Sequence, residues 1–314
     1  MTLVHWDEVD GFQIPDRLQP LGGRWQNLSD AAGSVAVGAK RVVLAPGQMI
    51  TPPHQHPAEE EIFHVLDGSA TLWQDGSTFG VSADDTIVHV AGGPAHTLIA
   101  GDDGLEVLIF GQRKTLEACL LPRTRVAWLG DESVSVLEAD PWKAEAALGV
   151  PEGNPGERPA NVVALADVEG DYGGSSKRLA KPAGATQSGL NWVKLPPNDE
   201  GAPPHCHSAE EEVFVILDGA GTLELWGLPR PGVAMQTVPQ ETHAIRRGHV
   251  IARPPGTRIS HSLRSGEAGL TYLAYGTREP NDMCYYPRSN KVFFRGLGVI
   301  ARLELLEYGD GEPG

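Results

Sequence analysis

Residues 52–68 read PPHQHPAEEEIFHVLDG, and residues 203–219 read PPHCHSAEEEVFVILDG. The second stretch repeats the pattern of the first 151 positions later, and a repeat of this length indicates two homologous units. Further along, FGQRKTLEACLLPR (110–123) matches YGTREPNDMCYYPR (275–288) at an offset of 165. The chain of 314 residues is therefore predicted to consist of two related halves.

Each half has the pattern of a β-protein. Short runs rich in Val, Ile, Phe, Leu and Thr are separated by Gly, Asp and Pro, as in EIFHVLDG at residues 61–68. The 38 Gly and 25 Pro residues favour a turn-dense architecture over helical bundles or coiled coils. We therefore predict an all-β chain with one sandwich or small barrel in each half.

The seam between the halves is predicted near residues 130–160. Asp140 and Pro141 together could open a short helix, with Asp as the cap and Pro at the first helical position. VPEGNPGERPA (150–160) is dense in Pro and Gly and is typical of a linker. The predicted domains are an N-terminal barrel at 1–145 and a C-terminal barrel at 160–314.

The second half carries extra residues between its repeated motif and its end. Most of them fall around LPRPGVAMQTVPQETHAIRR, residues 228–247. This insertion is a candidate lid or oligomer contact, and its composition does not choose between the two.

Composition excludes several classes of partner. The formal net charge is −16, so phosphate backbones and anionic lipids would be repelled, and we expect a small-molecule substrate instead. Three widely separated cysteines are typical of free thiols in a reducing compartment. The start, MTLVHWDEVD, lacks the pattern of a signal peptide, and no run of about 18 apolar residues could span a bilayer. We expect a cytoplasmic protein.

Three histidines and one glutamate recur in each half with metal-ligand spacing. Histidines two positions apart on a strand point to the same face, so both imidazoles can meet one ion. The candidate ligands are His54, His56, Glu61 and His96 in the first half, and His205, His207, Glu212 and His261 in the second.

A site with three imidazoles and one carboxylate suits Fe, Mn, Ni, Co or Zn as a divalent ion. Up to two such ions are predicted per chain. On a six-coordinate ion, two positions stay open for a substrate or for a substrate and O₂. On tetrahedral zinc the same four ligands would close the site.

The residues around these ligands have simpler interpretations. Gln55 and Cys206 lie between the paired histidines and should point away from the ion. His64 has outward parity and is predicted to pack on the outer face. Four further acids are predicted to form solvated turns: Glu59, Glu60, Glu210 and Glu211.

These motifs resemble the cupin superfamily in its two-barrel form. The family's first motif, HxH, four residues, Glu, six residues and Gly, is met twice, ending at Gly68 and Gly219. Its second motif, P-x-G-x-x-H, is matched loosely by VAGGPAH, ending at His96, and by PPGTRISH, ending at His261. The resemblance implies two tandem jelly-roll barrels, or double-stranded β-helices, joined by a short helical and Pro-Gly linker. It also implies a metal ion inside each barrel.

The resemblance leaves the chemistry open, because one fold supports many reactions. Our main hypothesis is a dioxygenase-type oxidoreductase that acts on a small polar or phenolic substrate. The alternatives are a non-redox isomerase or decarboxylase, for which no general acid or base is identified, and a non-catalytic metal- or ligand-binding protein. By analogy with the family, a homodimer is also possible.

Overall fold

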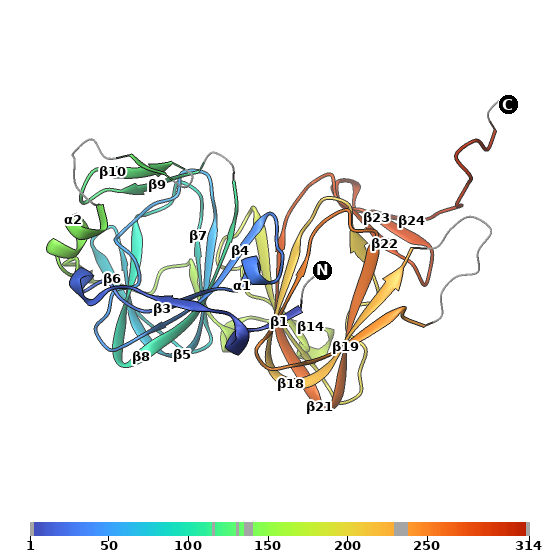
Figure 1. The fold of residues 1–314 in the computed structure, drawn as a ribbon, viewed down its shortest axis with the longest axis horizontal. Helices are drawn as coiled ribbons and strands as arrows, with labels where there is room; N and C mark the ends of the chain where they lie inside the picture. Colours follow the sequence, from blue (N-terminus) through green and yellow to red (C-terminus); the bar gives the residue numbers. More distant parts are fainter. Residues whose placement is uncertain (1–2, 115–116, 130–131, 135–140, 229–237, 312–314) are drawn as a thin grey trace.

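The computed structural model describes residues 3–114, 117–129, 132–134, 141–228 and 238–311. Within these ranges the chain is almost entirely β-structure and forms two barrels, side by side along the long axis of the molecule (Figure 1). The α-helices there are short: α1 (Leu28–Ala31) and α2 (Pro141–Ala147). The prediction of an all-β chain with two tandem barrels is confirmed.

The strands of the first barrel's sheet are β2 (Gly11–Gln13), β3 (Arg24–Asn27), β4 (Val37–Leu44), β5 (Glu61–Gln74), β6 (Ser77–Ser82), β7 (Asp85–His89), β8 (His96–Gln112), β12 (Asn154–Pro155) and β13 (Val162–Ala164). They follow the order β12-β6-β5-β8-β4-β3-β2, while β7 pairs with β5 and with β13. The long strands β5 and β8 run antiparallel and form the centre of this barrel.

The strands of the second barrel's sheet are β1 (Leu3–His5), β14 (Gly170–Asp171), β15 (Ser176–Arg178), β16 (Ser188–Leu195), β18 (Glu212–Gly227), β19 (Glu241–Arg246), β20 (His249–Arg253) and β21 (Ile259–Thr277). Their order is β1-β20-β18-β21-β16-β15-β14, with β19 on β18. The pair β18 and β21 repeats the antiparallel pair of the first barrel.

Each barrel also carries a small sheet at its upper end in Figure 1. One consists of β9 (Ala118–Leu121), β10 (Val126–Leu129) and β11 (Glu132–Val134). The other consists of β17 (Cys206–His207), β22 (Met283–Tyr286), β23 (Lys291–Phe294) and β24 (Val299–Arg302). Short 3₁₀ turns occur at Trp6–Glu8, Asp16–Leu18, Leu165–Asp167, Tyr172–Gly174 and Arg295–Leu297.

The two barrels exchange their first strands. β1, at the start of the chain, pairs antiparallel with β20 of the second barrel. β13, which begins the second half, pairs antiparallel with β7 of the first barrel. Each sheet is thus completed by a strand from the other half of the chain. The domain boundaries 1–145 and 160–314 stay a prediction, based on the sequence repeat.

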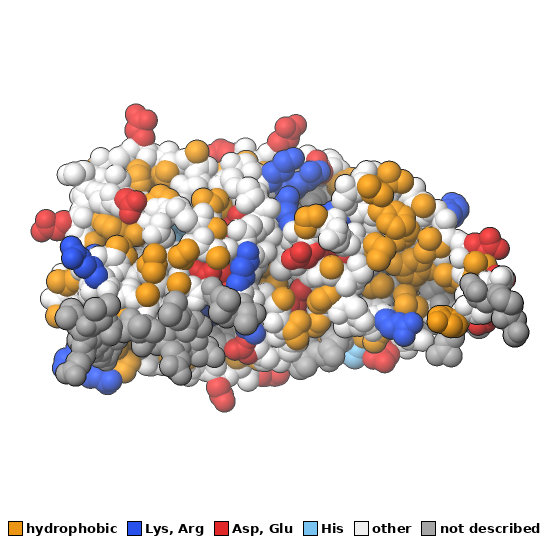
Figure 2. Space-filling view, turned by 90° about the horizontal axis from the view of Figure 1, so that it is seen from above, with side chains coloured by type: hydrophobic (Ala, Val, Ile, Leu, Met, Phe, Trp, Pro, Cys, Tyr) orange, Lys and Arg blue, Asp and Glu red, His pale blue; other side chains and the backbone are white. Residues whose placement is uncertain are grey.

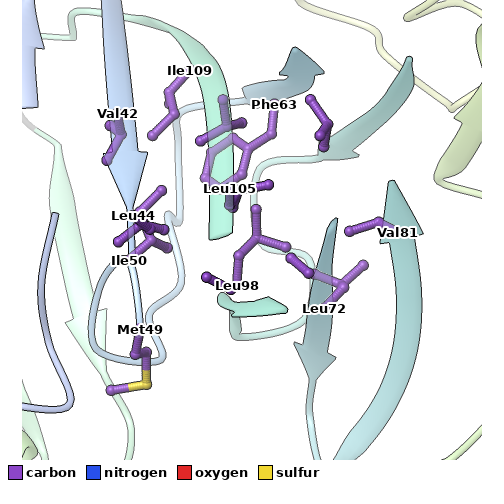
Figure 3. Packing of buried hydrophobic residues seen from close by; sticks show 14 of the residues in the cluster. Val42, Leu44, Met49, Ile50, Phe63, Leu72, Val81, Leu98, Leu105 and Ile109 are labelled. Atoms are coloured by element: carbon purple, nitrogen blue, oxygen red, sulfur yellow. The ribbon is translucent and has the colours of Figure 1, made fainter. Parts of the chain in front are cut away.

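Alternation along β5 separates the interior of the first barrel from its outer face. Phe63 and Val65 point inward, into the buried cluster drawn in Figure 3, together with Leu72 and Leu98. Burying each large apolar side chain of this kind stabilises the fold by roughly 1.5–3 kcal/mol. This core closes the lower part of the barrel and leaves its upper part for polar groups.

The outer faces of the two sheets form the interface between the barrels. Ile62 of β5 and Val213 of β18 are fully buried in one shared cluster. Phe110 and Tyr275, which occupy equivalent positions in the repeat, stack with 5.3 Å between their ring centroids. His64 faces this side as predicted, and its Nδ1 lies 2.9 Å from the Thr86 hydroxyl.

Two buried acids join the barrels reciprocally. Glu60 accepts hydrogen bonds from the backbone N–H groups of Thr186 (2.8 Å) and Ser188 (3.1 Å) in the other half. Its repeat equivalent, Glu211, accepts one from the N–H of Val35 at 3.0 Å. The prediction of solvated turns was wrong for Glu60, Glu210 and Glu211, because each of these side chains is buried and its carboxylate accepts hydrogen bonds from backbone N–H groups.

The backbone conformation explains why both motifs end in glycine. Gly68 and Gly219 have φ values of +78° and +76°. A Cβ at either position would lie 2.2 Å from the carbonyl oxygen of Gly104 or Gly269 on the neighbouring strand. Only glycine combines this left-handed backbone with such a close approach.

The predicted connection and insertion are described in part. A short helix does begin at Pro141, as expected, while Asp140 lies outside the described residues. Residues 229–237 of the predicted insertion also lie outside them. Part of the remainder forms β19, which pairs with β18.

Charged side chains are interspersed over the face in Figure 2, where a hydrophobic area lies over the second barrel. In the part of the chain that the structure describes, no helix has the length and apolar character needed to cross a bilayer.

Candidate metal centres

The four predicted ligands of the first half meet at one point in the first barrel. Glu61 is the first residue of β5, and His96 is the first residue of β8. An isolated antiparallel β-bridge pairs the backbone of His96 with that of His54. The Nε2 atoms of His54, His56 and His96 each lie 3.3 Å from Oε2 of Glu61. One carboxylate oxygen therefore faces three imidazole nitrogens.

The second barrel repeats this arrangement. Nε2 of His205, His207 and His261 lies 3.5, 3.4 and 3.1 Å from Oε2 of Glu212. His205 and His261 are joined by reciprocal backbone hydrogen bonds of 3.1 and 2.8 Å. All eight predicted ligand residues are thus brought together in two groups of four.

Backbone carbonyls fix the orientation of three of the rings. Nδ1 lies 3.0 Å from the Pro52 carbonyl in His54, 3.2 Å from the Pro94 carbonyl in His96, and 2.7 Å from the Pro203 carbonyl in His205. A carbonyl only accepts, so Nδ1 must donate in each case. The lone pair then resides on Nε2, which is the atom that faces the glutamate and is free to bind a metal ion.

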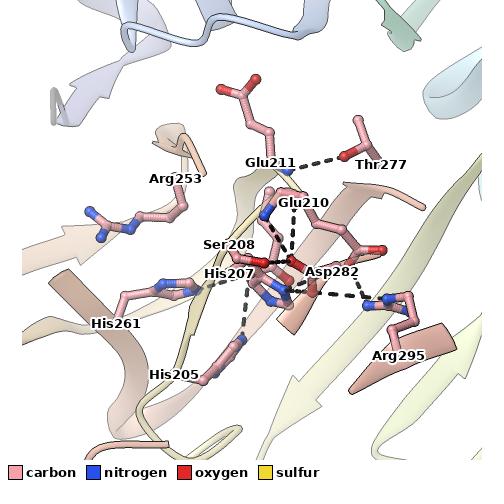
Figure 4. A network of polar contacts seen from close by, with 12 residues as sticks. His205, His207, Ser208, Glu210, Glu211, Arg253, His261, Thr277, Asp282 and Arg295 are labelled. Carbon is pink, nitrogen blue, oxygen red and sulfur yellow. Dashed lines mark hydrogen bonds and ion pairs between the residues drawn. The ribbon is translucent and has the colours of Figure 1, made fainter. Parts of the chain in front are cut away.

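An acid lies behind the second histidine of each pair. Asp282 Oδ2 lies 2.7 Å from Nδ1 of His207, as Figure 4 shows, and Glu117 Oε1 lies 3.4 Å from Nδ1 of His56. A carboxylate in this position orients the ring and raises the basicity of the ligand nitrogen. Sequence reasoning missed both acids, although the repeat at offset 165 aligns Glu117 with Asp282.

Electrostatics favours a charged glutamate at the first centre. Burial alone would raise the pKa of Glu61, but the charge of His56 and hydrogen bonds from the histidines hold it well below its ordinary value. Burial lowers the pKa of His54 to about 4. Burial also acts to lower the pKa of His56, but the Glu61 charge outweighs it and raises that pKa to about 9. Without a metal ion, the proton that His56 carries beside Glu61 supplies the positive charge that a cation would bring.

The second centre shows unsatisfied polar atoms of the kind that an ion would satisfy. Among the described residues, Glu212 Oε2 and the Nε2 atoms of His207 and His261 are buried without a hydrogen-bond partner. Buried polar atoms seldom remain unpaired. Their convergence and their nitrogen and oxygen donors fit a divalent transition metal, so both centres are suited to hold one ion each.

Aromatic rings support the third histidine of each set. Phe63 and Phe214 have the inward parity expected of a barrel floor, and their ring centroids lie 5.9 Å from that of His96 and 5.3 Å from that of His261. His89 stacks on His96 with 3.4 Å between ring centroids.

The cavity at the first centre is largely apolar. It has a volume of about 500 Å³ and opens directly onto His54, His56 and Glu61. Its aromatic and aliphatic walls include Phe12, Trp25, Phe63, Ile109, Trp128 and Trp142. Among its described lining residues, Lys40 is the one cationic side chain, and sequence reasoning did not identify it.

The cavity at the second centre differs in character. Its volume is about 760 Å³, and it reaches His205, His207 and Glu212. Its lining includes the acids Asp199 and Glu200 and the hydroxyl groups of several tyrosines and serines. The two centres share ligands but offer different surroundings to a bound molecule.

Comparisons with known proteins agree with this architecture. Residues 40–111 match the Cupin domain family. A structure from a study of the Mn(II) centres of Bacillus subtilis oxalate decarboxylase superposes with a TM-score of 0.60 at 16% identity, covering 90% of this chain and 78% of that chain. The formate complex of Lactobacillus farciminis oxalate decarboxylase gives 0.58 at 14% identity, covering 88% and 86%.

The comparison with curated proteins gives no match. At these identities the solved structures bear on the fold, and they share the arrangement of two barrels in one chain. The matched Cupin domain lies within the first barrel, and the chain as a whole shares the fold of these solved structures.

Proposed function

We propose that this chain is a metal-dependent enzyme of the non-redox class, a decarboxylase or isomerase, with its reactive centre in the first barrel. The substrate would be a small organic acid with an apolar or aromatic body. The fold neighbours named above are oxalate decarboxylases, which supports this class over the dioxygenase hypothesis. Oxalate itself would leave the aromatic walls without contacts, so we propose a larger 3-oxo acid.

The observation that carries this proposal is Lys40. It lies on β4, on the same face as the inward residues Val42 and Leu44, and lines the cavity that contains Glu61. It forms no ion pair with any described residue, and its Nζ lies 5.8 Å from the centroid of the Trp25 ring. The exposed ammonium group of Lys40 can attract a carboxylate at the edge of this cavity, and the aromatic rings would pack on the rest of the molecule.

The reaction follows from these positions. A divalent ion, when bound, supplies a Lewis acid that polarises a substrate oxygen. Lys40 Nζ would hold the carboxylate by charge-assisted hydrogen bonds, and the aromatic walls would exclude water. When the bond between C1 and C2 of a 3-oxo acid breaks, CO₂ leaves and the electron pair enters the enolate of the 3-oxo group. Lys40 Nζ would then return a proton to C2.

Carbon dioxide release under anaerobic conditions tests the proposal. Chain loaded with Mn(II) or Co(II) would be given aryl- and alkyl-substituted 3-oxo acids, with oxalate for comparison. We expect CO₂ without O₂ uptake, and Lys40→Met should raise KM for the acid more than it lowers kcat. Lys194→Met, which changes an exposed lysine of β16, is the matched control. Absence of any turnover of these acids, with metal bound, would reject the proposal.

A second candidate is the dioxygenase-type reaction on a phenolic substrate. The aromatic walls of the first cavity favour it, because a phenol ring would stack there with its hydroxyl directed toward the ion. Oxygen uptake by anaerobically Fe(II)-loaded protein on addition of a phenol distinguishes it from the first proposal.

Two further predictions concern the oligomeric state of the protein and its location in the cell. Association into a homodimer would be tested by light scattering on the purified chain. Location in the cytoplasm would be tested by fractionation of the cells that make it.

A further inference from the structure

A cysteine lies beside the paired histidines in each barrel. In the second barrel, the register of β17 and β22 places Cys284 directly opposite His207. In the first, reciprocal backbone hydrogen bonds of 2.9 Å between Gln55 and Leu120 place Cys119 opposite His56 in the same way. The two cysteines are 165 positions apart, at equivalent points of the repeat.

In each barrel the sulfur lies close to the paired histidines. One ligand atom from each of His54, His56 and Cys119 lies within 4.8 Å of the others, and the same holds for His205, His207 and Cys284. Two ligands on opposite sides of an ion, one sulfur and one nitrogen, are separated by about 4.4 Å at ordinary bond lengths. Both cysteines also line the cavity of their own centre.

We propose that Cys119 and Cys284 each bind the metal ion of their barrel as a thiolate. This inference depends on the metal centres of the proposed function and adds a sulfur to their three nitrogens and one oxygen. A six-coordinate ion would then keep one position for a substrate oxygen. Thiolate is a soft ligand, so these centres should prefer Co(II) or Zn(II) to Mn(II) by a wider margin than nitrogen and oxygen ligands alone would give.

The third cysteine of the chain provides an internal contrast. Cys206 stands between the two histidines of the second pair and faces the opposite side of the strand. It lines a second hollow of about 350 Å³, on the other side of His207, together with Met283 and Tyr285. Cys206 is therefore close to the second centre in sequence but directed away from it, and it serves as a matched control.

The test is the absorption spectrum of the Co(II)-loaded full chain under reducing, anaerobic conditions. Thiolate bound to Co(II) gives an intense near-ultraviolet charge-transfer band, whereas histidine and carboxylate ligands give only weak visible bands. We expect two equivalents of Co(II) and a strong band in the unchanged protein. Cys119→Ser and Cys284→Ser should each remove about half of the band, and the double variant should remove it while still binding Co(II).

Cys206→Ser should keep the full band. Two equivalents of bound Co(II) without the band in the unchanged protein would overturn the thiolate ligands and leave the metal centres standing. A band that persists in the double variant, or that is lost in Cys206→Ser, would also overturn them. Absence of Co(II) binding altogether would overturn both this inference and the proposed function.

Discussion

Single carboxylates behind the histidines determine how well each centre can hold an ion. Burial acts to raise the pKa of Asp282, but the hydrogen bond from His207 brings it to about 2, so the carboxylate is ionised at neutral pH. Its charge holds the His207 ring in one orientation. Glu117 has the same place in the first barrel at a longer distance of 3.4 Å.

Asp282→Asn should weaken metal binding at the second centre. The amide keeps the size of the side chain but loses the charge, and outer partners of this kind are worth about 10–100-fold in metal affinity. Titration with Co(II) against a competing chelator would measure the loss. Asp218→Asn, an exposed acid on β18, is the control and should bind as the unchanged protein does. Equal affinities for the two variants would contradict the role of Asp282.

His64→Asn should flatten the dependence of stability on pH. Burial lowers the pKa of His64 to about 4, against about 6.5 in the unfolded chain, so the unfolded state binds more protons between these values. Stability is therefore lost as pH falls from about 6.5 toward 4, by roughly 2 kcal/mol between pH 7 and pH 5 from this residue. Urea unfolding at both pH values would measure it. The same pH dependence in both proteins would contradict the assignment.

Spacing revealed the ligands but not their supporting groups. His54, His56 and Glu61 are close in sequence and share a strand-like parity, so their meeting point could be predicted. Glu117 and Lys40 reach the centre from distant segments. The repeat at offset 165, which preserves an acid and a cysteine in both halves, was a signal for Glu117, whereas no pattern in the sequence pointed to Lys40.

At the scale of whole strands, alternation predicted which faces are buried but not which edges pair. The inward parity of Phe63 and Val65 follows from the strand period of two. The exchange of β1 and β13 does not, because residues 3–11 and 162–170 look alike and would suit either barrel. Edge pairing depends on how the two barrels are placed, which is a property of the tertiary structure.

Deletion of residues 1–5 should loosen the second barrel, although these residues begin the first half of the sequence. Without β1, one edge of β20 loses its partner, and its amides on that side become open to solvent. Hydrogen exchange should accelerate in residues 249–253 and stay unchanged in β7. Deletion of residues 309–314, of which the described residues 309–311 are exposed, is the control. Faster exchange in β7 with an unchanged β20 would contradict the exchange of strands.

For the whole molecule, the interface between the barrels was the least predictable feature. Glu60 and Glu211 belong to a run of three acids that is typical of a solvated turn. Their surroundings come from the opposite half, 126 and 176 positions away along the chain, where backbone N–H groups need acceptors. A sequence pattern reports local exposure, so it could not show that two acids become buried once the barrels meet.

Glu60→Ala and Glu211→Ala should each destabilise the assembly of the two barrels. Each substitution removes a buried carboxylate and leaves partly buried N–H groups of the other barrel without their acceptor, at a cost of about 1–3 kcal/mol in the free energy of unfolding. In the double variant the barrels should lose their coupling, so that calorimetry shows two transitions where the unchanged protein shows one.

Glu60→Gln keeps one acceptor oxygen, so its free energy of unfolding should fall less than that of Glu60→Ala. Glu267→Ala, at an exposed position, should unfold as the unchanged protein does. A double variant that still melts in one transition at an unchanged temperature would show that apolar packing alone, through the stacked Phe110 and Tyr275, joins the barrels.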